Sequence, residues 1–149
     1  MWKQLLFEIK KIEEKYGDAL NKSASNEQIE NFEKIVQEKF NYVLPEQYIA
    51  FLKTVNGLEF NGFTFYGVDS ALLDNEGQSV YGFIDSNEIW HENEHQKQYI
   101  FFGDSNLSWY CSDLLKGVYV ELDKPSGTVI NTYSDFNAML EKALKHSLS

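Results

Sequence analysis

The sequence predicts an α+β fold, with N-terminal helices, a central antiparallel strand meander and a C-terminal helix packed on the sheet. Two observations predict it. Apolar residues recur at helical spacing between residues 2 and 55 and again after residue 134. Between these regions the chain holds short apolar runs separated by Gly, Asn, Asp and Ser, which is typical of strands joined by turns. Strands do not alternate with helices, so the order disfavours a parallel sheet with helical crossovers.

Length and composition indicate a single domain over residues 1–149 with a substantial core. Of the 149 residues, 43% are hydrophobic and 15% aromatic, which is too apolar for a disordered chain. No apolar run approaches the ~20 residues that a membrane helix needs, and Glu8 interrupts the apolar start too early for a signal peptide. The single cysteine, Cys111, permits no internal disulfide and is expected to be a small buried hydrophobe. We therefore expect a cytoplasmic protein without a membrane segment.

Three amphipathic helices are expected first. The opening helix covers residues 2–16. The second begins at Ser25, which forms a capping box with Gln28, and the third begins at Pro45 and stops at Asn56-Gly57. The apolar stripe of the opening helix comprises Trp2, Leu5, Leu6, Ile9, Ile12 and Tyr16.

Short strands and turns follow, and then a last helix. The predicted strands cover residues 58–60, 63–66, 99–102, 107–111, 118–122 and 128–133. One helical turn is expected near Ala71, inside a loop over 68–80. The polar stretch 85–98 predicts a short exposed helix capped by Asp85 or Ser86, and Ser134 is expected to cap the last helix.

The negative charge lies in one part of the chain. The net charge is −10, and residues 58–133 account for −9 of it, with three lysines against twelve acidic residues. All 13 basic residues are lysines, so the arginine that usually reads phosphates and bases is absent and nucleic acid is a poor partner. An acidic surface suits a basic partner, although it would also serve solubility alone. Residues 58–96 contain no lysine and eight acids: Glu59, Asp69, Asp74, Glu76, Asp85, Glu88, Glu92 and Glu94.

The segment from His91 to His95 matches the zinc motif H-E-x-x-H. In that motif two histidines share one helix face and bind zinc, and the glutamate acts as general base. Here the intervening positions are Asn93 and Glu94, the flanks are polar, and no third ligand follows on a second helix. A solvated segment is the favoured interpretation, and a zinc hydrolase is kept only as a remote alternative. No other catalytic pattern is present, so we expect no catalytic residues, no metal and no cofactor.

Several motifs in sequence order resemble the SUKH superfamily, the bacterial immunity proteins related to fungal cell-wall-synthesis regulators. The resemblance spans about residues 25–144. It is carried by Leu44-Pro45, Tyr48-x-x-Phe51-Leu52-x-x-x-Asn56-Gly57, Phe65-Tyr66-Gly67, Ile100-Phe101-Phe102-Gly103-Asp104, Gly117-Val118-Tyr119-Val120, Ser126-Gly127 and Tyr133-Ser134-x-Phe136-x-x-x-Leu140. The segment 85–98 is an insertion relative to the family pattern.

The resemblance implies an α+β fold and a non-catalytic role, in which the protein neutralises a cognate toxin domain, often a nuclease. It transfers no individual contact residue. We expect a monomer or weak dimer. The charge pattern indicates that it binds the toxin through the eight acids named above and the adjacent turn at Asp104, with Trp90 as a candidate aromatic anchor. Trp109 and Tyr110 are further candidate anchors, although core packing is favoured for both. The alternative is an intracellular scaffold or regulator with an endogenous partner.

Overall fold

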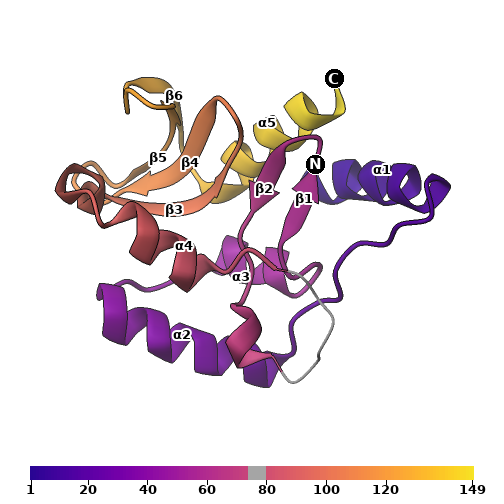
Figure 1. Ribbon diagram of the computed structural model, residues 1–149, viewed down its shortest axis with the longest axis horizontal. Helices are drawn as coiled ribbons and strands as arrows, with labels where there is room; N and C mark the ends of the chain where they lie inside the picture. Colours follow the sequence, from indigo (N-terminus) through magenta and orange to yellow (C-terminus); the bar gives the residue numbers. More distant parts are fainter. Residues whose placement is uncertain (74–79) are drawn as a thin grey trace.

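The computed structural model describes residues 1–73 and 80–149, and Figure 1 shows helices packed around an antiparallel sheet. The helices are α1 (Trp2–Lys15), α2 (Asn26–Phe40), α3 (Glu46–Leu52), α4 (Phe83–Trp90) and α5 (Phe136–Leu148). The strands are β1 (Leu58–Phe60), β2 (Phe63–Phe65), β3 (Tyr99–Asp104), β4 (Ser108–Asp113), β5 (Val118–Asp123) and β6 (Val129–Tyr133). Two 3-10 turns, η1 (Ser70–Leu72) and η2 (Glu94–Gln98), lie in the connections. None of the described helices is long and apolar enough to cross a lipid bilayer.

The strands follow one another across the sheet in chain order, each antiparallel to the next. This confirms the predicted meander, and every predicted strand lies within two residues of the observed one. Asn61 and Gly62, with φ of 48° and 79°, join β1 to β2 in the left-handed conformations that a two-residue hairpin requires. Gly103 marks an irregularity in the pairing of β3 with β4, at a point where a Cβ would meet the Thr64 carbonyl oxygen.

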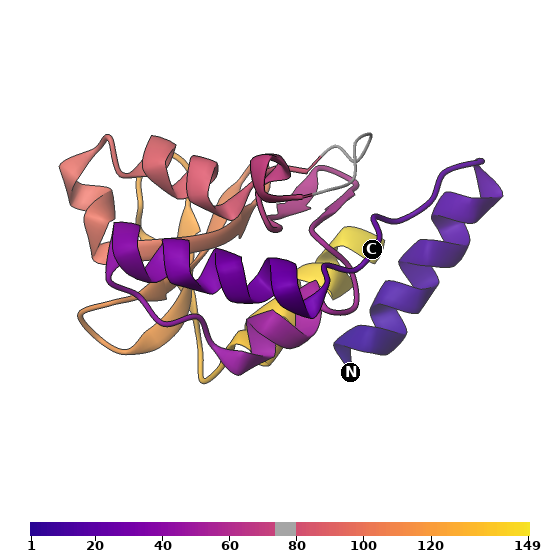
Figure 2. The same cartoon turned by 90° about the horizontal axis from the view of Figure 1, so that it is seen from below.

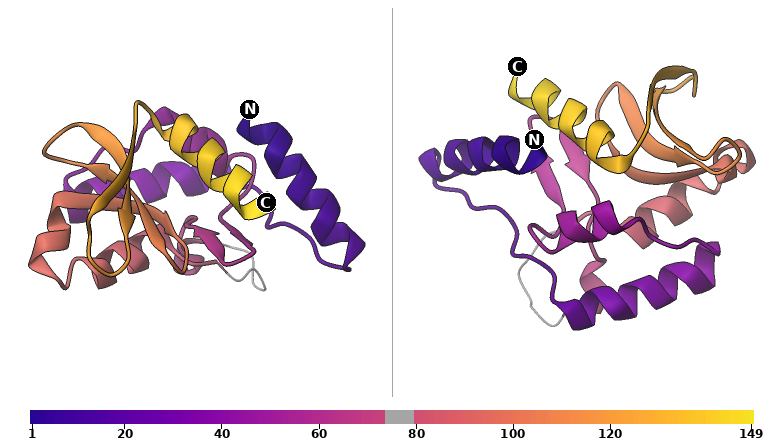
Figure 3. Two further views of the ribbon diagram at one scale, coloured as in Figure 1. Left: turned by 90° about the horizontal axis from the view of Figure 1, so that it is seen from above. Right: turned by 180° about the vertical axis from the view of Figure 1, so that it is seen from behind.

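Aromatic side chains fill the space between the sheet and the helices. Phe102 of β3 meets Tyr48 of α3, Phe83 of α4 and Phe136 of α5, with ring centroids between 4.9 and 5.7 Å apart. The Tyr48 hydroxyl donates to the Tyr66 carbonyl at 2.6 Å, so the buried phenol has a partner. α2 lies alongside α4, where Phe32 and Phe40 contact Phe83, while α1 packs beside α5 (Figures 2 and 3).

The predicted exposed helix over 85–98 is wrong in extent and in burial. α4 begins two residues earlier, at Phe83, and ends at Trp90. Its inner face carries Phe83, Ile84 and Asn87, which are all buried. Asn87 accepts from the Phe101 N–H at 2.7 Å and donates to the Phe101 carbonyl at 2.9 Å. Because β2 pairs with β3 only around Gly103, α4 supplies the partner for the next stretch of the β3 edge.

Other predicted helix boundaries also differ from the observed ones. α2 has the predicted capping box, but Asp135, and not Ser134, caps α5 by accepting from the Ala138 N–H at 2.8 Å. α3 ends at Leu52, so Asn56-Gly57 does not terminate it. Asn56 instead bonds both backbone groups of Val68. In α1 the predicted stripe holds for Trp2, Leu6 and Ile9, whereas its C-terminal members Ile12 and Tyr16 are exposed.

Candidate binding site

A groove of about 410 Å³ lies between α4 and the turn that joins β3 to β4. The antiparallel pairing of β2 with β3 brings Tyr66, Asp104 and the β1–β2 turn to one wall, and α4 forms the opposite wall. The groove is lined by Gly62, Thr64, Tyr66, Tyr81, Ser86, Ile89, Trp90, Asp104, Ser105, Asn106 and Lys124. It therefore gathers side chains that are separated by up to about 60 positions in the sequence.

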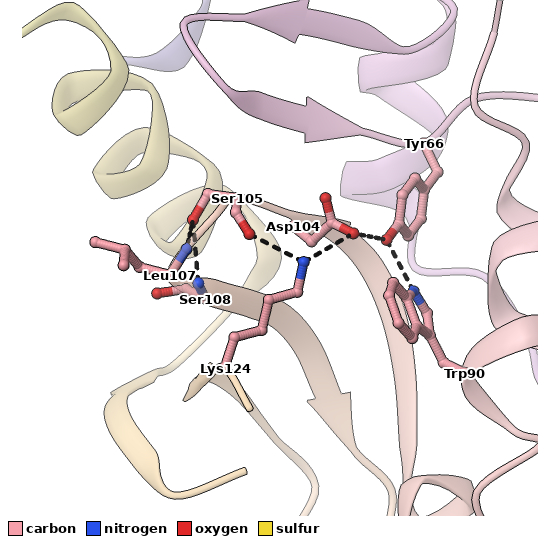
Figure 4. Close-up of polar contacts among 7 residues, drawn as sticks. All are labelled: Tyr66, Trp90, Asp104, Ser105, Leu107, Ser108 and Lys124. Atoms are coloured by element: carbon pink, nitrogen blue, oxygen red, sulfur yellow. Dashed lines mark hydrogen bonds and ion pairs between the residues drawn. The ribbon is translucent and has the colours of Figure 1, made fainter. Parts of the chain in front are cut away.

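A chain of hydrogen bonds crosses the groove from α4 to β3 (Figure 4). The Trp90 Nε1–H donates to the Tyr66 hydroxyl at 3.0 Å, and that hydroxyl donates to Asp104 Oδ2 at 2.9 Å. Two residues predicted for partner binding, Trp90 and Asp104, are thus brought together by a tyrosine between them. Trp90 remains half-buried, with part of its ring facing the groove.

Lys124, directly after β5, joins the same network from the other side. Its ammonium group lies 3.6 Å from Asp104 Oδ2 and donates to the Ser105 carbonyl at 3.0 Å. It also sits 5.4 Å from the ring centroid of Trp90 and 5.6 Å from that of Trp109, within the range of a cation–π interaction. The side chains of Lys124 and Asp104 are only 22% and 21% exposed, so solvent screens this pair less than an open surface pair.

The network holds the groove side chains in fixed orientations. Burial raises the pKa of the Tyr66 phenol well above its ordinary value, and the negative charge of Asp104 raises it further. The phenol therefore stays neutral and continues to donate its hydrogen bond to Asp104. A wall whose rotamers are already ordered loses less entropy when a partner binds. The arrangement is suited to recognition by an aromatic ring and a carboxylate held at defined positions.

Three other predicted acids share the outer face of α4 and the turn that follows it. Asp85, Glu88 and Glu92 are spaced three and four residues apart and are exposed around Ile89, which is 58% exposed. We call these three residues the acidic face of α4. Glu88 forms an ion pair with Lys39 of α2 at 3.2 Å. This face borders the groove, because Ile89 belongs to both.

Of the remaining predicted acids, those that the structure describes are not part of this surface. Asp69 is 5% exposed and its carboxylate accepts from the backbone N–H groups of Ile84 and Asp85, both at 2.9 Å, so its inclusion as a partner contact is wrong. Glu59 is exposed on β1, away from α4, and Glu94 in η2 pairs with Lys97 at 2.8 Å. Asp74 and Glu76 lie outside the described residues.

Trp109 and Tyr110 are core residues. They are 6% and 1% exposed, which favours packing over partner contact for both. The sequence did not indicate that Tyr66 or Lys124 belongs to a binding site. Tyr66 was visible only as part of a family motif, and no local pattern around Lys124 signals that it meets Asp104 across a strand turn.

The H-E-x-x-H segment does not form the single helix on which that motif places its two histidines. α4 ends at Trp90, His91 follows as its C-cap, and His95 lies in the separate turn η2. The His91 Nε2–H donates to the Tyr99 carbonyl at 2.7 Å, so this ring is engaged in the fold. Among residues 1–73 and 80–149 there is no group of three or more His, Cys, Asp or Glu able to hold a metal ion. Cys111 is buried, and burial raises the pKa of its thiol, so it lacks the features of a nucleophile.

Comparison with known protein families finds that residues 23–142 match the SMI1 / KNR4 family (SUKH-1). The matched range includes the groove and the acidic face of α4. A comparison with curated proteins finds no match.

Proposed function

This chain belongs to the SMI1 / KNR4 family (SUKH-1), and from that premise we propose that it is an immunity protein that binds and neutralises a cognate bacterial toxin domain. It acts by covering the toxin, without making or breaking a covalent bond. We place this action in the cytoplasm, with the protein as a monomer or weak dimer. The observation that most supports the proposal is the family match, which covers most of the chain.

Charge supports a basic toxin surface, such as the phosphate-binding surface of a nuclease. Residues 58–133 carry a net charge of −9, and the acidic face of α4 presents three carboxylates beside one groove. Complementary charge accelerates encounter and selects against acidic partners. In this proposal Asp85, Glu88 and Glu92 steer the toxin to the groove.

The groove would supply the close contact. Trp90 offers a large apolar ring whose N–H already has a partner, and Asp104 is fixed by Tyr66 and Lys124. Half-buried aromatic rings held in a preorganised wall are typical of residues that contribute most to binding energy. We therefore propose Trp90 and Asp104 as the contact residues at the centre of the interface.

The proposal is tested by co-expressing the chain with the toxin domain encoded beside it. Cells that receive both genes should grow, whereas cells that receive the toxin with an empty vector should not. The purified pair should form a stoichiometric complex at low ionic strength. A Trp90→Ala variant should weaken the complex, while Tyr16→Ala, which removes an exposed aromatic ring beyond α1, should leave it unchanged.

A folded chain that forms no complex with any neighbouring toxin, even at low salt, would contradict the immunity function. Recovery of an endogenous cytoplasmic protein through the same groove would instead support the alternative, a scaffold or regulator. Loss of that capture in Trp90→Ala would show that both functions use one site.

A further inference from the structure

A second groove, of about 620 Å³, lies on the other side of the β3–β4 turn from the first. Its walls come from the β1–β2 turn and the start of β2, the β3–β4 turn and β4, β5, β6 and the end of α5. The side chains that matter here are Phe63, Leu107, Tyr110, Glu121, Ile130 and His146. Gly62, Ser105 and Asn106 line both grooves, so the two form one continuous edge of the molecule.

Glu121 of β5 is the distinctive group in this groove. It is only 8% exposed, and its carboxylate accepts three hydrogen bonds from neutral groups. Ser108 Oγ donates at 2.7 Å, and Asn131 Nδ2 and the Tyr133 hydroxyl each donate at 3.1 Å. No lysine or histidine in the described part of the chain forms an ion pair with it. A buried carboxylate is normally paired with a cation, so this one has hydrogen-bond partners but lacks a counter-charge.

The neighbouring tyrosines add no charge to the groove. Burial raises the pKa of Tyr110 and of Tyr133, and in both cases the charge of Glu121 raises it further. Both phenols are therefore neutral. Asp123, also in the groove wall, adds a second carboxylate, which is bonded to the Ser126 hydroxyl at 2.6 Å.

Three apolar side chains, Phe63, Leu107 and Ile130, also line the groove, among polar residues of the two turns. Leu107 and Ile130 are 70% and 48% exposed, and Phe63 is half-buried with the His146 ring 5.5 Å away, centroid to centroid. Apolar walls that lead to a carboxylate match the structure of a long basic side chain, which has an alkyl stem and a charged head.

We propose that this groove is an anchor pocket for one lysine or arginine side chain of the partner, with the basic head on Glu121 and the stem along Phe63, Leu107 and Ile130. The identity of the partner rests on the proposed function, in which the partner is a basic toxin domain. The carboxylate of Glu121 favours a basic head group, and the apolar side chains favour an alkyl stem. An acidic side chain would be repelled, and a purely apolar one would leave Glu121 without a counter-charge.

The first test uses Glu121→Gln, which removes the charge at nearly constant size. The affinity for the toxin domain should fall about thirtyfold or more, mainly through faster dissociation, as expected when one partner of a buried charge pair is lost. Glu46→Gln is the matched control, since it removes the same charge from an exposed site on α3, and its affinity should stay within about twofold of wild type. Leu107→Trp, at an exposed turn, should also weaken binding by filling the pocket while leaving Glu121 in place.

The second test needs no toxin. N-ethylguanidinium titrated into the wild-type protein should cause saturable NMR shifts at the Ile130 and Leu107 methyl groups, and Glu121→Gln should abolish them. If the toxin complex forms but Glu121→Gln and Leu107→Trp bind as tightly as wild type, the pocket assignment is overturned while the immunity function stands. If no toxin complex forms, the immunity function fails, and the guanidinium titration alone decides the pocket. Concentration-dependent dimerisation that Glu121→Gln abolishes would instead identify a second copy as the occupant and overturn the proposal.

Discussion

Asp69 shows how a carboxylate can serve the fold within a region that looks like a charged surface. It lies just before η1 and accepts from the backbone N–H groups of Ile84 and Asp85 at the start of α4, 15 and 16 positions downstream. Gly82, the N-cap of α4, has no side chain, and a Cβ there would meet the Asp69 carboxylate. Asp69 thereby satisfies donors that the first turn of a helix leaves unpaired. The sequence alone predicts Asp69 on the acidic surface, because the residues around it give no sign that it caps the start of α4.

The titration of Asp69 should be visible in stability. Burial raises its pKa above the ordinary value of 3.8, although the two backbone donors oppose the shift. A carboxyl group with a raised pKa in the folded state contributes most below its unfolded pKa, and this contribution is lost as pH rises through the folded value. The free energy of unfolding of wild type minus that of Asp69→Asn should therefore decrease as pH rises above about 4. Urea titrations followed by circular dichroism from acid to neutral pH measure it, and a difference that increases with pH would contradict the assignment.

At the scale of elements, α4 acts as a substitute for a strand. β2 is three residues long and leaves part of the β3 edge without a partner. The amide of Asn87 occupies that position and bonds both the N–H and the carbonyl of Phe101. Asn56 bonds Val68 in the same two-sided manner. These clamps position α4, and with it Trp90 and the acidic face, relative to the sheet.

Replacing Asn87 by Leu should therefore destabilise the protein severely. The apolar side chain has a similar volume but leaves two buried backbone groups of Phe101 unpaired, at about 1–3 kcal/mol each. We expect a loss of about 3 kcal/mol in chemical denaturation, together with weaker partner binding because Trp90 is no longer held in place. Glu92→Ala, at an exposed position two residues beyond α4, should change stability by less than about 0.5 kcal/mol. Equal stabilities for the two variants would show that the clamp does not hold α4.

At the scale of the molecule, charge is divided unevenly. Residues 1–57 have eight lysines and nine acids, whereas residues 58–133 have three lysines and twelve acids. The first segment forms α1, α2 and α3, and the second forms the sheet and α4. A partner that responds to charge should therefore approach the sheet and α4 and not the N-terminal helices.

Charge reversal tests this asymmetry. The double variant Asp85→Lys/Glu92→Lys should reduce the association rate constant with the toxin domain roughly tenfold at low ionic strength and flatten its salt dependence. Glu8→Lys/Glu30→Lys makes the same change in net charge at exposed positions of α1 and α2, and should have a much smaller effect. Stopped-flow association across a salt series provides the rates. Equal slowing by the two pairs would mean that only net charge matters and that no acidic face exists.

Much of the site could not be predicted, for a reason that its residues make clear. The motif-level resemblance placed the chain in the right superfamily, and the charge count drew attention to residues 58–96. Two of the predicted contacts, Trp90 and Asp104, do meet, but only through Tyr66 and beside Lys124. The Glu121 pocket was missed because an acidic residue inside an alternating strand gives no signal of burial until its neighbours on β4 and β6 are known.

Local patterns in the chain were enough to predict α1, α2, α3, α5, the strand meander and its turns, because apolar periodicity and turn chemistry act between residues a few positions apart. Long-range contacts in the folded chain determine which carboxylates are buried, where α4 starts and stops, and which side chains share a groove. Those outcomes depend on hydrogen bonds between groups far apart in the chain, such as Asp69 with α4 and Asn87 with β3. A buried polar group needs a hydrogen-bond partner, and the fold brings that partner from a distant part of the sequence.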